Sequence, residues 1–405
     1  MRVTIGLLAA LAVLFAAGVE AQVMPPEPDA SEIRVHFGPL WLKPTFALTN
    51  LGEDTNVFNA ATNNAPQRDF TFGLTPQSDL YLRVGRTWLM GSVKEDLIWY
   101  QKFADQRSVN QNYTASWLIP LTRMAFDVGG NYVHTRERPG YEIDTRPRRT
   151  EKAVNGIFEL RALSKTYVGV RGERRKIDYD SAAVFLGTDL QIELTRTLTS
   201  EALTLRHKVT PLTSITFDIG KEQERFDFSP IRDSNSTSFN AGVSFDRFAI
   251  INGSAQIGYR NFKPLSPDLP TYTGSTAQVN LSYSALGSTR LGVTAIRELQ
   301  DSFDIDQPYY LQTGINGSIA QQIYGPLDVQ GRLGVQRLAY LTRPGVVVQA
   351  PNRVDRVQMY GVGVGYRLGR DLRFGVNIDE QKRQSVVNIL QYDGLRYGVA
   401  ITYGQ

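Results

Sequence analysis

The pattern that most constrains this chain is the alternation of apolar and polar residues, which recurs in segment after segment from about residue 32 onward. Residues 276–286, 309–323, 372–379 (LRFGVNID) and 395–403 (LRYGVAITY) show it clearly. Because successive side chains of a β-strand point to opposite sides, each such segment has one apolar and one polar face. The alternation therefore predicts an all-β chain whose strands separate two different environments.

The connections between these segments distinguish the chain from a soluble antiparallel sheet, which shows the same alternation. The segments span about ten to fifteen residues, which exceeds the usual five or six, and they follow one another without a helical insertion. Short turns are predicted at residues 85–88, 120–122, 164–166, 211–213, 250–253, 286–288, 324–326 and 369–371. Long loops are predicted near residues 51–68, 104–111, 137–149, 180–198, 227–235, 263–273, 301–308, 342–354 and 384–392.

This strict alternation of short turns and long loops along the chain is typical of transmembrane β-barrels. We therefore predict an all-β, antiparallel up-and-down transmembrane barrel of about 18 strands. Sixteen strands is the alternative, because residues 180–210 fit either one long strand or a loop followed by a strand. A barrel of this size leaves an aqueous lumen.

Composition supports this interpretation and excludes several other classes of protein. Hydrophobic residues make up 42% of the chain and the mean hydropathy is −0.25, which is too low for a helical membrane protein. Cysteine is absent, so disulfides and thiolate metal sites are excluded. The net charge is +4 with both signs spread along the chain, unlike the concentrated basic patch of a nucleic-acid-binding protein.

The N-terminus predicts export from the cytoplasm. Arg2 precedes an apolar run at residues 4–17, and Ala21 ends a small-residue cleavage pattern. We expect residues 1–21 to be a signal peptide cleaved after Ala21, with an uncleaved anchor helix as the alternative. Residues 22–31 would then form a short periplasmic segment and residues 32–405 the barrel. The expected location is the outer membrane of a Gram-negative cell, where lipid and lipopolysaccharide would surround the barrel.

The last strand carries the most specific local motif. Arg396, Gly398, Ile401 and Tyr403 occupy the polar, glycine, apolar and aromatic positions of a pattern that resembles the β-signal of outer-membrane proteins. That resemblance implies recognition by the barrel-assembly machinery. The chain departs from the pattern because two residues follow the terminal aromatic residue. A generic edge strand is the alternative interpretation.

The whole mature chain resembles outer-membrane β-barrel porin families, in particular the type encoded with exopolysaccharide biosynthesis and export. The resemblance is carried by the opening segment Gly38–Phe58, by a hairpin unit of about forty residues, and by turns such as Leu163–Thr166 and Thr210–Ser214. It implies a porin fold, an outer-membrane location and polysaccharide-export components as partners. Its motifs are loose and specify no substrate.

Strand phase places many charged residues on the face opposite the apolar one, so they are candidates to line the lumen. A charge buried against lipid costs several kcal/mol, so these residues need a wet or mutually paired interior. They suit either a polar pore for a hydrated solute or sugar chain, or an ion-paired network that stiffens the wall. The candidates are Lys43, Arg83, Asp127, Glu159, Arg161, Arg171, Glu173, Arg175, Arg206, Lys208, Asp218, Glu222, Glu224, Asp246, Arg260, Arg290, Asp328, Arg332, Arg373, Asp379 and Arg396.

A basic loop is predicted at the side of the barrel with the long connections. Its arginines are Arg136, Arg138, Arg146, Arg148 and Arg149. Guanidinium groups suit phosphate and carboxylate, so lipopolysaccharide phosphates or an acidic polysaccharide are candidate partners. A solvated loop with no partner is an equally good interpretation, because runs of charge are usually solvated.

No residue pattern indicates an enzyme or a cofactor. The three histidines, His36, His134 and His207, lie in no recognisable triad or metal-ligand spacing. The run GVGVG at residues 361–365 has no helix after it, so it does not predict a nucleotide site and is better explained as thinning the wall between large neighbours.

Three functions remain open from the sequence. The first is a channel that exports exopolysaccharide, the second is a general diffusion porin for small polar solutes, and the third is a non-conducting structural or adhesive barrel. A diffusion porin often folds one long loop inward as a constriction, and residues 137–149 and 180–198 are the candidates. No strand is obviously polar on its lipid face, so we expect a monomer.

Overall fold

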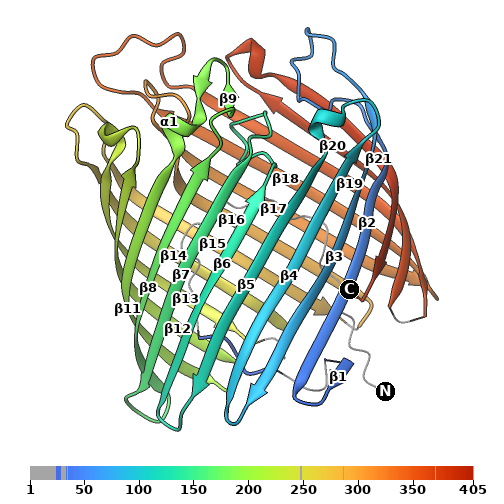
Figure 1. Cartoon of the computed structure of the whole chain (residues 1–405), viewed down its shortest axis with the longest axis vertical. Helices are drawn as coiled ribbons and strands as arrows, with labels where there is room; N and C mark the ends of the chain where they lie inside the picture. The colour runs from blue at the N-terminus through green and yellow to red at the C-terminus, as the bar shows by residue number, and fades with distance from the viewer. Residues whose placement is uncertain are drawn as a thin grey trace.

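The computed structural model describes residues 24–28, 33, 35–246, 249–285, 287–369 and 371–404. These residues form a closed antiparallel β-barrel of 18 strands (Figure 1). The last strand, β21 (Tyr392–Tyr403), pairs with the first long strand, β2 (Leu40–Asp54), and this pairing closes the cylinder. The predicted all-β barrel is confirmed, with the higher of the two strand counts. The predicted signal peptide and most of residues 22–31 lie outside the described residues.

The other barrel strands are 12 to 16 residues long, and each one pairs with the strands next to it in the chain. They are β3 (Asp69–Val84), β4 (Thr87–Tyr100), β5 (Ser108–Pro120), β6 (Met124–Thr135), β7 (Arg149–Arg161), β8 (Thr166–Tyr179), β11 (Arg196–Thr210), β12 (Thr213–Phe226), β13 (Ser234–Phe245), β14 (Ile251–Pro264), β15 (Tyr272–Ala285), β16 (Thr289–Asp301), β17 (Tyr309–Tyr324), β18 (Leu327–Leu341), β19 (Val354–Leu368) and β20 (Leu372–Gln384).

Shorter elements lie at the two ends of the barrel. A three-residue strand, β1 (Val35–Phe37), pairs with the start of β2. The connection from β8 to β11 holds the small hairpin β9 (Val184–Phe185) and β10 (Thr188–Asp189) and the helix α1 (Leu190–Leu194). Residues 180–210 are therefore a folded loop followed by one strand. Three short 3₁₀ turns are η1 (Ala104–Gln106), η2 (Pro230–Arg232) and η3 (Asn388–Leu390). No described helix is long and apolar enough to cross a membrane.

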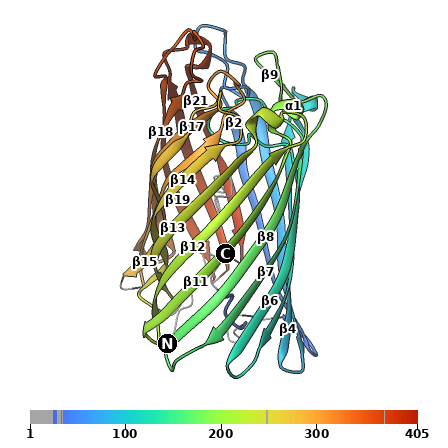
Figure 2. The same cartoon turned by 90° about the vertical axis from the view of Figure 1, so that its left-hand side faces the viewer.

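The predicted order of short turns and long loops is confirmed. Connections of two to five residues join the strands at one end, and connections of seven residues or more join them at the other. In Figures 1 and 2 the long loops gather at the top of the barrel and the short turns at the bottom. Two turns are displaced from their predicted places: the turn expected at 250–253 lies at 246–250, and that expected at 164–166 lies at 162–165.

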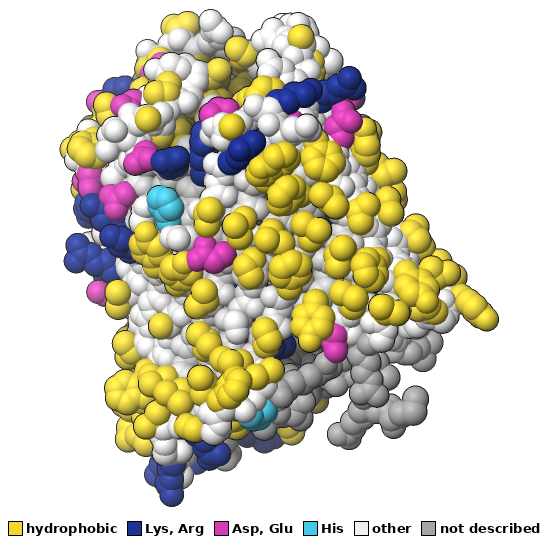
Figure 3. Space-filling model, turned by 45° about the vertical axis from the view of Figure 1, so that its right-hand side comes forward, with side chains coloured by type: hydrophobic (Ala, Val, Ile, Leu, Met, Phe, Trp, Pro, Cys, Tyr) yellow, Lys and Arg dark blue, Asp and Glu magenta, His cyan; other side chains and the backbone are white. Residues whose placement is uncertain are grey.

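The two faces of the wall match the alternation in the sequence. In β20 the side chains of Phe374 and Val376 are exposed on the outside, whereas Arg373 is buried inside. Figure 3 shows apolar side chains covering much of the outer surface of the wall. Closure of the sheet gives every strand a hydrogen-bonded neighbour on both sides, which the hydrocarbon interior requires because it offers the backbone no partner.

Glycines on the inner face of β19 make room for neighbouring side chains, as the sequence predicted. A Cβ added at Gly361 would lie 2.2 Å from a carboxylate oxygen of Asp379, and one added at Gly365 would lie 2.2 Å from a guanidinium nitrogen of Arg373. Long polar side chains from β18 and β20 therefore lie flat across β19. The glycine run thins the wall to accommodate ion pairs.

The seam between β2 and β21 explains two positions of the terminal motif. Arg396 donates to Asp54 at 2.8 Å across the seam. A Cβ added at Gly398 would lie 2.9 Å from the carbonyl oxygen of Leu51, where a bulge interrupts β2. Both residues therefore serve closure of the barrel. Recognition of Arg396, Gly398, Ile401 and Tyr403 by the assembly machinery stays a prediction.

Candidate functional site: the inner wall and the mouth of the barrel

The inner wall carries most of the charged residues that were expected to face the lumen. Asp127, Glu159, Arg171, Arg206, Asp218 and Arg373 are buried on the inner face of their strands. Five more lie on the same face and are half-buried: Glu173, Glu222, Arg260, Arg332 and Asp379. Arg83 and Asp246 lie at short turns, and Arg161 lies at the end of β7.

Most of these charges are paired with one another. Arg206 donates to both carboxylate oxygens of Glu159, at 2.9 and 2.5 Å. Arg260 bridges Glu222 at 2.6 Å and Glu298 at 3.3 Å. Arg332 lies 2.7 Å from Asp379. In these pairs each charge is neutralised by an opposite charge on the inner wall. The pairs agree with an ion-paired wall as well as with a polar lumen.

A polar hollow lies in this wall on strands β8 to β16. Its lining includes Arg171, Ser236, Ser238, Gln256, Arg260 and Glu298. Hydroxyl and amide groups alternate there with the paired charges, so water and hydroxyl-bearing solutes can exchange hydrogen bonds with it. The middle of the barrel is therefore lined by groups that suit a hydrated path.

The loop of residues 136–148, named the mouth loop below, reaches across the opening at the long-loop end. On one side Arg138 donates to the carbonyl oxygen of Val57 at 2.9 Å. On the other side Glu142 accepts hydrogen bonds from the hydroxyl of Ser302 at 2.7 Å and the backbone N–H of Phe303 at 3.2 Å. The loop thus contacts connections from distant parts of the barrel wall.

Arg383 of β20 holds the tip of the mouth loop. Its guanidinium group is fully buried and donates to the carbonyl oxygen of Glu142 at 2.8 Å and to the carboxylate of Asp144 at 3.0 Å. It also donates to Asp355 at 2.7 Å, and Asp355 accepts from Arg353 at 2.6 Å. A buried, multiply bonded arginine therefore fixes the loop to the wall opposite its own strands.

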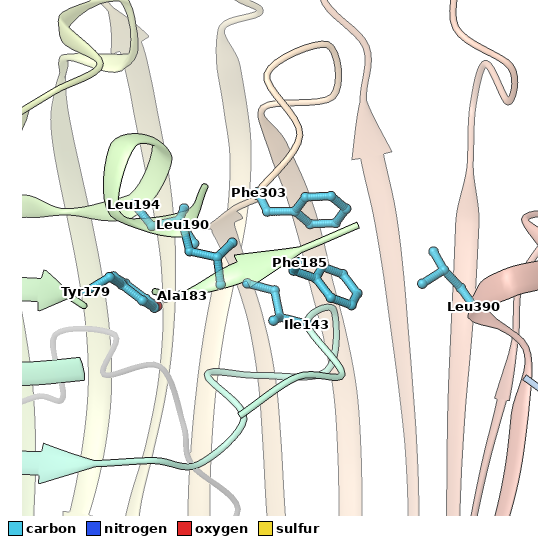
Figure 4. Close-up of a cluster of buried hydrophobic side chains, with 8 residues drawn as sticks. All are labelled: Ile143, Tyr179, Ala183, Phe185, Leu190, Leu194, Phe303 and Leu390. Carbon is cyan, nitrogen blue, oxygen red and sulfur yellow. The ribbon is translucent and has the colours of Figure 1, made fainter. Parts of the chain in front are cut away.

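An apolar cluster adds to the contacts that hold the mouth loop in place. It joins the mouth loop, the connection with α1, the loop before β17 and the loop before β21 (Figure 4). Its buried members are Ile143, Tyr179, Ala183, Phe185, Leu190, Leu194, Phe303 and Leu390. The rings of Phe185 and Phe303 meet edge to face with centroids 4.8 Å apart. Both candidates for a constriction loop, residues 137–149 and 180–198, contribute side chains to it.

The basic loop lies among the long connections, as predicted, but its arginines go against the interpretation of a solvated loop. Only Arg148 of the five is exposed. Arg136 donates to the carbonyl oxygen of Asp105, Arg146 stacks over the ring of Tyr100 at 5.0 Å, and Arg149 pairs with Glu151 at 2.8 Å. With Arg138 on Val57, these side chains are used to seat the loop. Their use as a binding site for lipopolysaccharide phosphates stays untested.

Sequence reasoning missed the residues that seat the loop. Glu142 lies 160 residues from Ser302 and 241 residues from Arg383 in the chain. Contacts over such separations produce no repeating pattern in the sequence. The one usable sign is an isoleucine, Ile143, that lies between two carboxylates, Glu142 and Asp144, in the polar loop. Apolar residues in a polar loop suggest burial.

The histidines occupy three separate places. His36 contacts the carbonyl oxygen of Ile33, His134 contacts Thr150, and His207 contacts Thr166. Among the described residues, no three His, Asp or Glu side chains lie close enough together to hold a metal ion.

The seating of the mouth loop is expected to depend on pH. Burial raises the pKa of Glu142 to about 7, although Ser302, Arg353 and Arg383 act in the opposite direction, and burial also raises the pKa of Asp144. In a displaced loop the Glu142 carboxyl would titrate near 4.5. The seated loop is therefore most stable below that pH, loses roughly 1.4 kcal/mol per pH unit up to about 7, and changes little above it.

Single-channel recording tests this expectation directly. Openings to a higher conductance should be more frequent at pH 8 than at pH 5, and Glu142→Gln should remove most of that dependence. Asp268→Asn, which changes an exposed carboxylate in another loop, should leave it intact. An unchanged pH dependence in Glu142→Gln would assign the titration to another group.

The chain matches a family of porins over nearly the whole length of the barrel. The family model described as "Putative beta-barrel porin 2" matches residues 37–404. No curated protein sequence matches the chain. Among solved structures the chain is similar to Pseudomonas aeruginosa OpdK with vanillate, at 9% identity and a TM-score of 0.47, covering 89% of this chain and 98% of that one.

Two further porins show a similar level of likeness. P. aeruginosa OccK2 in complex with glucuronate has 10% identity and a TM-score of 0.46, covering 89% of this chain and 97% of that one. A BenF-like porin from Pseudomonas fluorescens Pf-5 has 10% identity and a TM-score of 0.47, covering 89% of this chain and 98% of that one.

Proposed function

The chain belongs to the Putative beta-barrel porin 2 family, and from that premise we propose that it is an outer-membrane diffusion channel for small polar solutes. The observation that carries the proposal is the mouth loop, seated across the opening above a wall of paired charges and polar side chains. A loop fixed in this place narrows the opening, while the polar side chains of the wall below it allow water to fill the lumen.

The size of the solute follows from how the mouth loop is held across the opening. Glu142, Asp144 and Ile143 attach the loop by hydrogen bonds, an ion pair and apolar packing. Several such contacts acting together resist displacement far more than one surface ion pair does. A small sugar, amino acid or organic acid can pass beside a fixed loop, whereas a hydrated polysaccharide chain would require the loop to leave the mouth.

Export of exopolysaccharide, the first of the three functions considered from the sequence, rests on the resemblance to porins encoded with polysaccharide export. The seated loop is an obstacle to it, because a growing chain must cross the mouth continuously. A non-conducting structural barrel would need the remaining space to be filled, and the polar hollow in the wall argues against that.

Planar-bilayer and vesicle measurements test the proposal. We expect the purified barrel to give stable, ohmic conductance steps in KCl, and proteoliposomes to swell faster in a monosaccharide than in a trisaccharide. Protein denatured by heat before reconstitution is the control. Absence of any conductance would overturn the channel. Equal swelling for all sugars, together with loss of surface polysaccharide on deletion of the gene, would favour export.

A further inference from the structure

The short-turn end of the barrel is positively charged over one half of its circumference. The turns between β3 and β12, with two flanking residues on each side, contain Arg and Lys but no Asp or Glu. With Lys208 one residue further into β11, these cations are Arg83, Arg86, Arg123, Arg161, Lys165 and Lys208. The turns of the other half mix the signs. Counted in the same way, they contain Asp246, Asp328 and Asp371 together with Arg247, Arg290, Arg367, Arg370 and Arg373.

These six cations differ from the charges higher in the barrel because their charge is uncompensated. None of the acidic side chains that the structure describes forms an ion pair with any of them. Arg161 donates to the carbonyl oxygen of Thr122 at 2.8 Å, and Arg83 lies 5.5 Å from the ring centre of Trp88. A carbonyl oxygen or an aromatic ring can orient a guanidinium group, but it carries no formal negative charge and does not neutralise the cation.

Two of the cations lie on the inner face of the strands on either side of the aromatic residue Tyr167. Arg161 of β7 lies directly opposite Tyr167 of β8, and the Lys208 ammonium group lies 5.3 Å from the centre of the Tyr167 ring. Arg206 also stacks on this ring, at 4.3 Å, but Glu159 neutralises it. The net charge beside Tyr167 therefore comes from Arg161 and Lys208.

We infer that this basic sector makes the channel select anions, and that Arg161 and Lys208 form a subsite for a carboxylate or similar oxyanion near the short-turn exit. The inference rests on the proposed function, since it names the class of solute that the channel passes. Paired charges cancel one another at a distance, so the unpaired ones dominate the field in the vestibule. A guanidinium and an ammonium group together give an oxyanion several charge-assisted hydrogen bonds.

Reversal potentials under a KCl gradient measure this selectivity. The native channel should pass chloride more readily than potassium, with the preference growing as salt is lowered and screening weakens. In the double variant Arg161→Gln, Lys208→Gln the chloride-to-potassium permeability ratio should fall by roughly threefold. Sulfate should reduce the chloride current of the native channel more than that of the variant.

The matched control removes the same two residue types from the outer face of the wall, nearer the long-loop end of β7 and β8. Lys152 of β7 and Arg174 of β8 are exposed there, and the double variant Lys152→Gln, Arg174→Gln should keep the native permeability ratio. Heat-modifiable migration on gels verifies that each variant is folded. A conducting channel that prefers potassium, or an equal change in the control, overturns the inference while leaving the channel intact. Absence of any conductance would overturn both the proposed channel function and the inferred anion selectivity.

Discussion

Replacing residues 138–146 with a short Gly-Ser linker is expected to raise the single-channel conductance severalfold while the barrel stays folded. The segment removed carries Glu142, Ile143 and Asp144, which attach the mouth loop to the far side of the opening. Conductance depends on the narrowest cross-section of the water path. Removing the loop from the mouth should widen that cross-section and so raise the conductance. The two strands joined by the loop are neighbours, with Thr135 opposite Arg149, so a short linker can connect them.

A second loop provides the control for this replacement. The connection from β18 to β19 lies at the same end, and its tip residue Val347 is 98% exposed. Replacing residues 345–348 with a linker should leave conductance unchanged, because nothing there seats across the opening. If the mouth-loop replacement also leaves conductance unchanged, the narrowest point lies elsewhere in the barrel and the mouth loop does not set the size of the solute.

Local patterns predicted the wall of this barrel well because the wall is built from local rules. A strand that faces lipid on one side and the lumen on the other must alternate, and Phe374 and Arg373 show that alternation on adjacent residues. Consecutive strands lie side by side, so a turn of two to five residues is enough to join them. Gly361 and Gly365 were assigned correctly because glycine in a strand marks the close approach of another group.

The partners of the inner charges could not be predicted from alternation alone. Arg373 of β20 reaches Asp328 of β18, two strands away, because Gly365 of the strand between them has no side chain in the path. Phase assigns a residue to a face but does not give its rotamer or its reach. The sequence therefore placed these groups on one surface and left their pairing open.

The mouth was beyond sequence reasoning for a different physical reason. Its loops have no period, and their contacts join residues that are far apart in the chain, such as Glu142 and Arg383. A run of arginines is usually solvated, which made a solvated loop a reasonable interpretation. Here the fold supplies carbonyl oxygens, a tyrosine ring and carboxylates within reach of those arginines, and burial follows.

The second large effect is expected from Asp328→Ala, which should destabilise the barrel by about 3 to 5 kcal/mol. The Asp328 carboxylate is fully buried and accepts from Arg373 at 2.7 Å and from Arg367 at 3.1 Å. Removing it leaves two guanidinium groups close together, one of them buried, with no counter-charge. Urea unfolding in lipid vesicles, followed by tryptophan fluorescence, measures the change.

Asp379→Ala is the matched comparison, because it breaks a similar pair on the same face. The Asp379 side chain is 37% exposed and its partner Arg332 is 18% exposed, so water can replace the lost contact and a cost of at most about 1 kcal/mol is expected. The double change Asp328→Leu, Arg373→Met should recover much of the loss, since it removes the buried arginine as well as its partner. Equal effects of the two alanine variants would show that burial does not decide the cost, and that water reaches Asp328 as freely as it reaches Asp379.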